Sequence, residues 1–345
     1  MAGAFFKQTY FIPKPTLTEE NLPDQSGKVQ ISLLYRWNIL KLMIIPQVHI
    51  VTGGYAGIGL ELTKILYQKN ATIYAAGRSG GKAKKAIEAM KIEFANSTGK
   101  IEFLQLDLDD LSTIKRSAEE FLSKESRLDV LVNNAGVMVP PAGSKTKQGY
   151  DLQMGVNCIG PFLFTQFLLP ILQKTAATAP AGSVRITWAS SLAADLSAPK
   201  GGVEIDKDGA PKVQKNPELN YGQSKSGNVM FAVEAARRYG KDGIISTAWN
   251  PGHLKSELSR TAGLIQSIFI KLLANPPKLG GYTELYAGWS PDITLDNNGA
   301  YVIPWGRIGE YNSALAKVIK PEAKGGEGRA ERLWDWCERE TKKYT

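Results

Sequence analysis

The sequence is poor in metal-binding and redox-active side chains: its 345 residues include only two cysteines and two histidines. Cys158 and Cys337 do not form the pattern of a disulfide framework, which fits a reducing compartment, so we expect a cytoplasmic protein. His49 and His253 have no partners at metal-ligand spacing, so we expect no metal site. The amino terminus lacks a basic segment followed by an apolar run and a cleavage site, so no signal peptide is expected.

No block of like charge dominates the sequence, although 42 Lys and Arg residues outnumber 33 Asp and Glu residues. A net charge of +9 could indicate a nucleic acid or a membrane as partner. The basic residues are nevertheless spread along the chain, with only short clusters at 82–85 and 342–343. This distribution is typical of a solvated surface that also favours an anionic cofactor. We expect no nucleic-acid partner and no transmembrane segment, and a homodimer stays open.

Short apolar runs alternate with helix-like segments from residue 48 onward. The pattern predicts strands over 48–52, 71–76, 101–106, 128–132, 184–188 and 244–249, and helices over 57–70, 82–95, 111–122, 148–174 and 220–239. This alternation is typical of βαβ units with right-handed crossovers. The sequence therefore predicts an α/β fold, a doubly wound parallel sheet in a single domain.

Other segments lie outside this rhythm. We expect an amino-terminal extension over 1–28, an atypical insert over 29–47 and a helical carboxyl-terminal segment over 311–345. The main domain would cover 48–310 and include a substrate lid over 253–298. No internal repeat or low-complexity tract interrupts this organisation.

A glycine-rich turn follows the first predicted strand and opens the first predicted helix. It reads Thr52-Gly53-x-x-x-Gly57-Ile58-Gly59. Glycine permits a tight turn and the close approach of a pyrophosphate, while the helix N-terminus offers free N–H groups and a positive dipole end. The spacing differs from GxGxxG, and an ordinary strand-to-helix turn is the alternative. We expect this turn to bind a dinucleotide.

The second predicted strand ends in Ala76-Gly77-Arg78. An NAD-selective protein usually carries Asp or Glu at this point to accept from the ribose 2′-hydroxyl, whereas Arg suits a 2′-phosphate. We therefore expect NADP (NADPH) as the cofactor. Asp107, at the end of the third strand, is expected either to hydrogen-bond the adenine edge or to cap the following helix.

Tyr221 and Lys225 lie one helical turn apart and therefore on one helix face. A tyrosine hydroxyl has a pKa of about 10 and exchanges protons near neutral pH only if a cation lowers that value. We expect Lys225 and an oxidised nicotinamide to lower the pKa of Tyr221, which then moves a proton while the cofactor moves a hydride. A second Tyr-x-x-x-Lys, Tyr10 and Lys14, is interrupted by Pro13 and cannot be helical.

These motifs occur in the order typical of the short-chain dehydrogenase/reductase family, which the chain resembles over about residues 48–256. The order is the glycine turn, Asn133-Asn134-Ala135-Gly136, Asn157, Ser191, and Tyr221 with Lys225. The long interval between Ser191 and Tyr221 resembles the branch that includes retinol dehydrogenases and related carbonyl reductases. The resemblance implies a Rossmann-like sheet with strand order 3-2-1-4-5-6-7.

The resemblance also implies roles for the catalytic residues. Ser191 would hydrogen-bond the substrate oxygen, with Ser190 as the alternative. Asn157 would bind a water in a proton relay to Lys225. Lys225 would in addition hold the hydroxyls of the nicotinamide ribose.

Further residues would contact the cofactor by the same resemblance: Asn134, Ala135, Gly136, Pro251, Gly252, Leu254 and Ser256. For the first three, a purely structural turn is an equally good interpretation. Leu254 would bind the carboxamide through its backbone. Ser256 stands where many relatives have Thr, which is a mild departure from the family pattern.

These residues predict an NADP-dependent oxidoreductase that interconverts an alcohol and a ketone or aldehyde. The alternatives are an NADPH-dependent reductase of carbon–carbon double bonds and a non-catalytic NADP-binding sensor. The segment 253–298 is expected to line the substrate pocket. Its apolar Leu264, Ile265, Ile268 and Phe269 indicate a lipophilic carbonyl or alcohol substrate, although helix packing explains them equally well.

The insert 29–47 directly precedes the first predicted strand. Without it, Lys28 would lead into Val48 in a normal entry to that strand. The insert starts with Val29, which GTN encodes, and ends with Gln47, which CAG can encode; its 19 residues correspond to 57 nucleotides. We interpret it as a short intron that was translated in the gene model.

The alternative interpretation of the insert is a membrane-associating helix. Its apolar stretch is too short to span a bilayer, and Arg36, Asn38 and Lys41 interrupt it. On either interpretation we expect a loop or helix outside the parallel sheet.

Overall fold

The computed structural model describes residues 8–9, 12–34, 39–255 and 274–345. In this part of the chain one eight-stranded sheet has the order β10-β9-β8-β7-β6-β3-β4-β5. Its strands are β3 (Val48–Thr52), β4 (Thr72–Gly77), β5 (Lys100–Gln105), β6 (Val130–Asn133), β7 (Val184–Ala189), β8 (Ile244–Trp249), β9 (Tyr301–Ile303) and β10 (Arg307–Gly309). The strands from β3 to β9 are parallel and confirm the predicted order 3-2-1-4-5-6-7; β10 adds an antiparallel edge strand that we did not predict.

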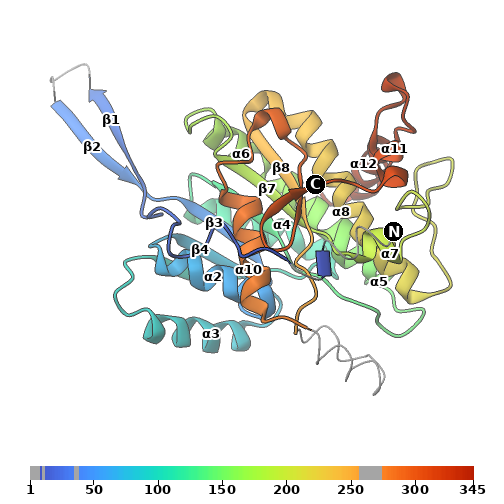
Figure 1. The fold of residues 1–345 in the computed structure, drawn as a ribbon. Helices are drawn as coiled ribbons and strands as arrows, with labels where there is room; N and C mark the ends of the chain where they lie inside the picture. The colour runs from blue at the N-terminus through green and yellow to red at the C-terminus, as the bar shows by residue number, and fades with distance from the viewer. Residues whose placement is uncertain (1–7, 10–11, 35–38, 256–273) are drawn as a thin grey trace.

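Helices cover both faces of this sheet (Figure 1). One face carries α2 (Gly57–Gln68), α3 (Gly80–Glu93) and α10 (Pro277–Trp289). The other carries α4 (Leu111–Lys124), α6 (Gly160–Ala176) and α8 (Pro217–Tyr239), with α11 (Ser313–Ile319) and α12 (Arg329–Thr341) packed outside α8. Short helical elements are α5 (Leu152–Met154), the π-helix η1 (Gly155–Ile159), α7 (Ala193–Leu196), and the 3-10 turns η2 (Gly240–Asp242), η4 (Leu295–Asn297), η5 (Glu322–Lys324) and η6 (Lys342–Tyr344).

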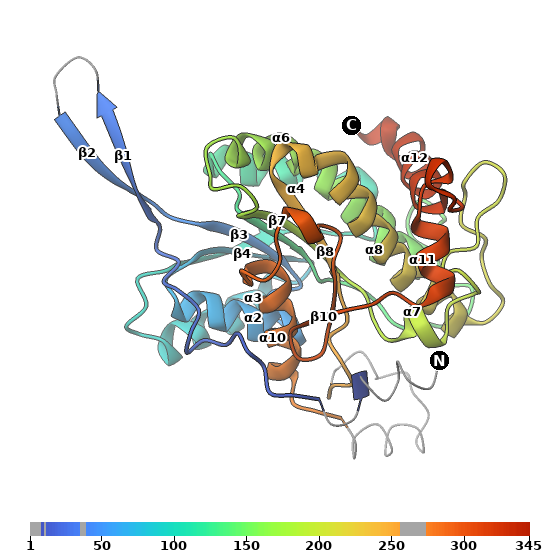
Figure 2. The ribbon, with the colours of Figure 1, turned by 45° about the horizontal axis from the view of Figure 1, so that its top comes forward.

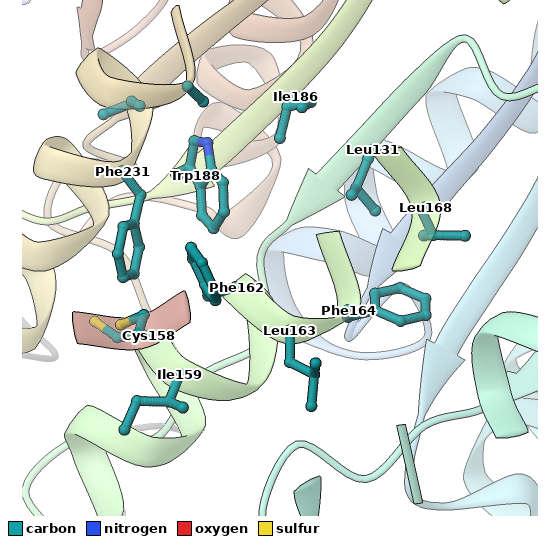
Figure 3. Close-up of a cluster of buried hydrophobic side chains, with 14 of the residues drawn as sticks. Leu131, Cys158, Ile159, Phe162, Leu163, Phe164, Leu168, Ile186, Trp188 and Phe231 are labelled. Carbon is teal, nitrogen blue, oxygen red and sulfur yellow. The ribbon is translucent and has the colours of Figure 1, made fainter. Parts of the chain in front are cut away.

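The central strands are apolar along their whole length because helices bury both of their faces. On the α6–α8 face, the rings of Phe162, Trp188 and Phe231 meet under the sheet (Figure 3). Ring centroids are 5.5 Å apart for Phe162 and Phe231, and 5.4 Å apart for Trp188 and Phe231. The continuous helix over 152–176 has the length and composition of a membrane span, but most of it is buried in this core.

The insert forms two strands. β1 (Lys28–Leu34) and β2 (Ile39–Ile45) pair antiparallel in a ribbon of their own, separate from the main sheet. The ribbon projects from the body of the molecule (Figures 1 and 2). The position outside the parallel sheet is confirmed, but a loop or helix was the wrong prediction. The two segments are rich in Val, Ile and Leu, which favour strands, and their pairing satisfies backbone groups that a loop would leave to solvent.

Candidate active site

A cleft of about 330 Å³ opens at the carboxyl ends of β3 to β6. In folds of this kind the ligand binds at this edge, where the strand order reverses. Half of the predicted cofactor residues line the cleft: Gly53, Gly57, Ile58, Arg78, Asp107, Asn134, Ala135 and Gly136. Thr52 and Gly59 are buried behind it.

The glycine turn has the geometry of an anion cradle. Gly57 has a φ of +55°, and open space lies where its side chain would be. A Cβ on Gly59 would come 2.5 Å from Nδ2 of Asn134 and 2.8 Å from the carbonyl oxygen of Gly53, so only glycine fits there. Ala56 precedes α2 and offers no side-chain cap, which leaves the first N–H groups of the helix free for a ligand. The turn therefore fits a dinucleotide pyrophosphate.

Thr52 and Asn134 hold the floor of the cleft together. The hydroxyl of Thr52 accepts from the backbone N–H groups of Asn134 and Ala135, both at 2.9 Å. Nδ2 of Asn134 donates to the carbonyl oxygen of Thr52 at 2.7 Å. The side chain of Asn134 is thus structural, while the turn after β6 still lines the cleft. The hydrogen bonds support the structural interpretation of this turn, and its contact with the cofactor stays a prediction.

Asp107 lies in the cleft lining and does not cap a helix. The cap of α4 is Asp110, which accepts from the backbone N–H of Ser112 at 3.1 Å. The capping alternative for Asp107 was therefore wrong, because the chain makes one more turn between the strand and the helix. The carboxylate of Asp107 accepts from the N–H of Asp109 at 3.0 Å and keeps further acceptor capacity.

Arg78 and Tyr55 form the outer end of the cleft. The side chain of Arg78 is exposed, and within the described residues its guanidinium has no hydrogen bond or ion pair. Tyr55 lies over Gly77, where a Cβ would come within 2.6 Å of the tyrosine hydroxyl. That hydroxyl accepts from the N–H of Ser79 at 3.0 Å. Tyr55 is not among the predicted site residues, although its position inside the glycine turn was a signal for it.

Ser191, Tyr221 and Lys225 come together where β7 ends beside α8. The Ser191 hydroxyl is close enough to Tyr221 to act as a neighbour that lowers its pKa. Nζ of Lys225 lies 5.7 Å from the centre of the Tyr221 ring and donates to the carbonyl oxygen of Ala189 at 3.0 Å. Ser190 is turned away, because its hydroxyl donates to the carbonyl oxygen of Lys225 at 2.9 Å. The geometry favours Ser191 over Ser190 as the partner of Tyr221.

Burial shifts the pKa values of Tyr221 and Lys225 in the free protein. Burial raises the pKa of Tyr221 to about 12, and the neighbouring hydroxyl of Ser191 offsets only part of that rise. Burial lowers the pKa of Lys225 to about 8. In the free protein, desolvation dominates the pKa of Tyr221, and the charge of Lys225 is directed at the carbonyl oxygen of Ala189. The lowering of this pKa by Lys225 together with an oxidised nicotinamide stays a prediction.

Asn157 lies in η1, between the cleft and α8. Its Oδ1 accepts from the N–H of Val137 at 2.7 Å. Its Nδ2 donates to the carbonyl oxygen of Val137 and to the hydroxyl of Ser224, both at 2.9 Å. The side chain therefore ties the cleft wall to the Tyr221 helix, and both of its donor hydrogens are used. The water relay to Lys225 stays a prediction.

The turn after β8 borders the cluster. Gly252 donates its N–H to Oδ1 of Asn250 at 3.1 Å, and Trp305 packs over it. Leu254 is buried and forms a parallel β-bridge with Asn275. Pro251 lies between these residues in the same turn. The predictions for Ser256, Leu264, Ile265, Ile268 and Phe269 lie outside the described residues.

Metal chemistry has no visible support in the described ranges. They contain no group of three or more His, Cys, Asp or Glu side chains that could hold a metal ion. His49 is fully buried at the start of β3, away from the cleft lining.

The fold and the site define a class of protein: an oxidoreductase with a dinucleotide cleft beside a group that can transfer a proton. Residues 47–203 match the family model described as short chain dehydrogenase. The chain is 42% identical over 339 residues to the short-chain dehydrogenase/reductase bet4 of Neocamarosporium betae, covering 97% of this chain and 92% of that protein. It is 44% identical over 333 residues to the short-chain dehydrogenase/reductase pkfC of Emericella nidulans, covering 96% and 97%. The chain belongs to the short-chain dehydrogenase/reductase family, whose members use a nicotinamide cofactor.

Solved structures share the fold. An NADPH-bound carbonyl reductase from chicken fatty liver aligns with a TM-score of 0.57 and 22% identity, over 77% of this chain and 99% of that chain. A 3-oxoacyl-[acyl-carrier protein] reductase from Brucella melitensis, in complex with NAD, aligns with a TM-score of 0.55 and 23% identity, over 74% and 94%. At this identity the likeness establishes the Rossmann-like architecture and leaves the choice between the two cofactors to the residues of the cleft.

Proposed function

We propose that this protein is an NADPH-dependent reductase that interconverts a lipophilic ketone or aldehyde and its alcohol. The observation that carries the proposal is the grouping of Ser191, Tyr221 and Lys225 next to the dinucleotide cleft. Nζ of Lys225 would lie 3.4 Å from a Cβ placed on Gly136, which lines that cleft. When bound, the nicotinamide supplies the hydride. The hydroxyls of Ser191 and Tyr221 would donate to the substrate oxygen as negative charge builds up on it.

Tyr221 is suited to act as the proton donor in reduction. With a pKa of about 12 it is protonated at neutral pH and can give its proton to the developing alkoxide. Lys225 keeps its charge below its pKa of about 8, and that charge would favour the tyrosinate that remains. A non-catalytic NADP sensor has no need of a buried lysine, since burying its charge costs stability.

Arg78 supports NADP as the preferred cofactor. Its guanidinium stands at the outer end of the cleft with no ion-pair partner among the described residues, and β4 ends without an acidic residue. A 2′-phosphate would be its natural partner, whereas the 2′-hydroxyl of NAD offers no charge to pair with.

The remaining features of the proposal concern the surroundings of the site. Segment 253–298 would act as the substrate lid. Cys158 and Cys337 are buried free thiols, as suits a cytoplasmic location. The division of the chain into the segments 1–28, 29–47, 48–310 and 311–345 is also part of this proposal.

A cofactor and substrate screen tests the proposed function. The protein would be incubated with NADPH or NADH and a panel of ketones, aldehydes, quinones and α,β-unsaturated ketones, with products identified by mass spectrometry. We expect alcohols from the saturated carbonyls and a higher kcat/KM with NADPH. Saturated ketones as products of the enones alone would favour double-bond reduction. Tight NADPH binding with no product from any compound would favour the sensor.

A further inference from the structure

The amino-terminal segment is packed along the molecule as part of its core. Leu17 and Leu22 are buried in the hydrophobic cluster of the α2–α10 face, at 9% and 3% exposure. Glu19 forms an ion pair with Lys278 of α10 at 2.6 Å. This packing carries the chain from the entry to β3 across to the carboxyl edge of the sheet (Figure 2). The segment that we predicted as an extension therefore reaches the active-site edge.

Gln8 lies at this edge of the sheet, against the turn after β8. It is only 4% exposed, and its Oε1 accepts from Nδ2 of Asn250 at 2.7 Å. Its Nε2 lies 3.5 Å from Oδ2 of Asp195, at the long limit for a hydrogen bond. One side chain thus joins the turn after β8 to α7, the short helix that follows Ser191.

Asn250 and Asp195, the two partners of Gln8, each accept a further hydrogen bond from another residue. Oδ1 of Asn250 accepts from the N–H of Gly252, so the Asn250 amide spans from Gln8 to the turn beside the site. Oδ1 of Asp195 accepts from Asn312 at 2.7 Å. Asn250 is 1% exposed, so without Gln8 its Nδ2 would be a buried donor with no partner.

We propose that Gln8 is a positioning residue of the active site, which holds the Asn250–Gly252 turn at a fixed distance from α7, the short helix that follows Ser191. It touches neither cofactor nor substrate and acts through Asn250. The kinetic consequence rests on the proposed function, because the turn matters for hydride transfer only if a nicotinamide lies beside it. The structural consequence can be measured without cofactor.

Hydrogen–deuterium exchange on the free protein tests the structural part. Gln8→Met keeps the length of the side chain and removes both hydrogen bonds. Thr9→Val is the matched control, because the buried hydroxyl of Thr9 has no partner within the described residues. We expect the backbone N–H groups of Asn250, Gly252 and His253 to exchange about tenfold faster in Gln8→Met and at the wild-type rate in Thr9→Val. Unchanged exchange in Gln8→Met would overturn the proposal.

Kinetics with the best carbonyl of the screening panel test the positioning role. A loosened turn should lower kcat by about tenfold while the Kd of NADPH changes less than about twofold, since the glycine turn and Arg78 are untouched. With NADPH deuterated at C4, the isotope effect on kcat should rise, because hydride transfer becomes slower than the other steps. A general loss of folded protein would lower activity without changing the isotope effect, and that result would contradict positioning.

A failure of the proposed function gives a different pattern. Wild-type protein would then turn over no carbonyl, while the exchange experiment would still decide whether Gln8 holds the turn.

Discussion

Lys225 combines complete burial with a positive charge. Its side chain is 6% exposed, its Nζ donates to a backbone carbonyl oxygen, and among the described residues no carboxylate pairs with it. Burial accordingly lowers its pKa from 10.5 to about 8. Such a residue destabilises the fold, and a catalytic site is where this cost is expected.

Replacing this lysine should separate stability from activity. We predict that Lys225→Met abolishes turnover and raises the free energy of unfolding at pH 7 by about 1–3 kcal/mol, because it removes a buried charge. The unfolded lysine holds its proton up to pH 10.5, and the folded one loses it near pH 8. The wild type therefore gains stability between these values, and the advantage of the variant should shrink there. Urea unfolding at pH 7 and 10 measures this; a variant less stable than wild type at pH 7 would contradict it.

Tyr221 can be tested by removing one oxygen. Tyr221→Phe should keep NADPH binding and lose a factor of about 10²–10⁴ in kcat, because only the proton donor is removed. Tyr150→Phe is the control: its hydroxyl donates to Glu340 at 2.6 Å, outside the site. If Tyr221→Phe retained more than about a tenth of the wild-type rate, the assignment of Tyr221 as general acid would be wrong.

Arg78 is the residue on which cofactor choice should depend. Arg78→Asp replaces a partner for phosphate with a group that repels it and can accept from a ribose hydroxyl. We expect the ratio of kcat/KM for NADPH to that for NADH to fall by about 100-fold or more. Lys84→Asp on exposed α3 makes the same charge change outside the cleft lining and serves as the control. An unchanged ratio in Arg78→Asp would show that this arginine does not select the cofactor.

Among the secondary-structure elements, the β1–β2 ribbon forms a sheet separate from the main one. Its two ends are held close together, since Lys28 pairs with Ile45 and the N–H of Gln47 donates to the carbonyl oxygen of Gln25 at 3.4 Å. The strand β3 starts only at Val48, after the ribbon. A shortened chain could therefore pass from Lys28 into β3 with little rearrangement.

Deletion of residues 29–47 should leave a folded and active enzyme with better solubility. The reason is that the deletion removes an apolar ribbon that forms a two-stranded sheet of its own and keeps every strand of the main sheet. Circular dichroism, Tm and kcat/KM of the shortened and full-length proteins measure the outcome. Transcript sequencing tests the origin of the segment: a mature message that contains these 57 nucleotides would refute a translated intron.

For the molecule as a whole, the central strand β3 carries a buried histidine. His49 is 0% exposed, neither ring nitrogen has a partner within the described residues, and its ring meets Trp289 edge-on at 5.1 Å. Burial lowers its pKa from 6.5 to about 4, and the charge of Asp129 offsets only part of this. The folded protein thus resists protonation of His49 in a range where the unfolded chain accepts it.

This histidine should make the fold sensitive to acid. Between pH 6.5 and 4 the unfolded state binds one more proton at this position than the folded state, so stability falls as the pH falls, by up to about 3 kcal/mol. In His49→Leu that contribution should disappear, and unfolding free energies measured in urea at pH 7 and 4.5 should differ less than in the wild type. An equal difference in both proteins would show that His49 does not contribute to acid sensitivity.

The class of the fold and the order of the site residues could be predicted from sequence patterns. Both depend on residues that are close in the sequence. The alternation of apolar runs predicts strands and helices. The turn that contains Gly57 and the pair Tyr221 and Lys225 each lie within a short stretch of the chain. Even so, α8 starts at Pro217, before the predicted Asn220, because Asn216 caps it.

Other features of the site depend on contacts between residues that are far apart in the sequence, and these contacts are visible in the tertiary structure alone. The geometry that favours Ser191 over Ser190 depends on the carbonyl oxygen of Lys225, 35 residues from Ser190, which accepts from the Ser190 hydroxyl. The raised pKa of Tyr221 follows from burial that no window of sequence contains. The role of Gln8 arises from a contact with a residue 242 positions away. Hydrogen bonds and desolvation depend on distances in space, and the fold sets these distances by bringing together residues that are far apart in the chain.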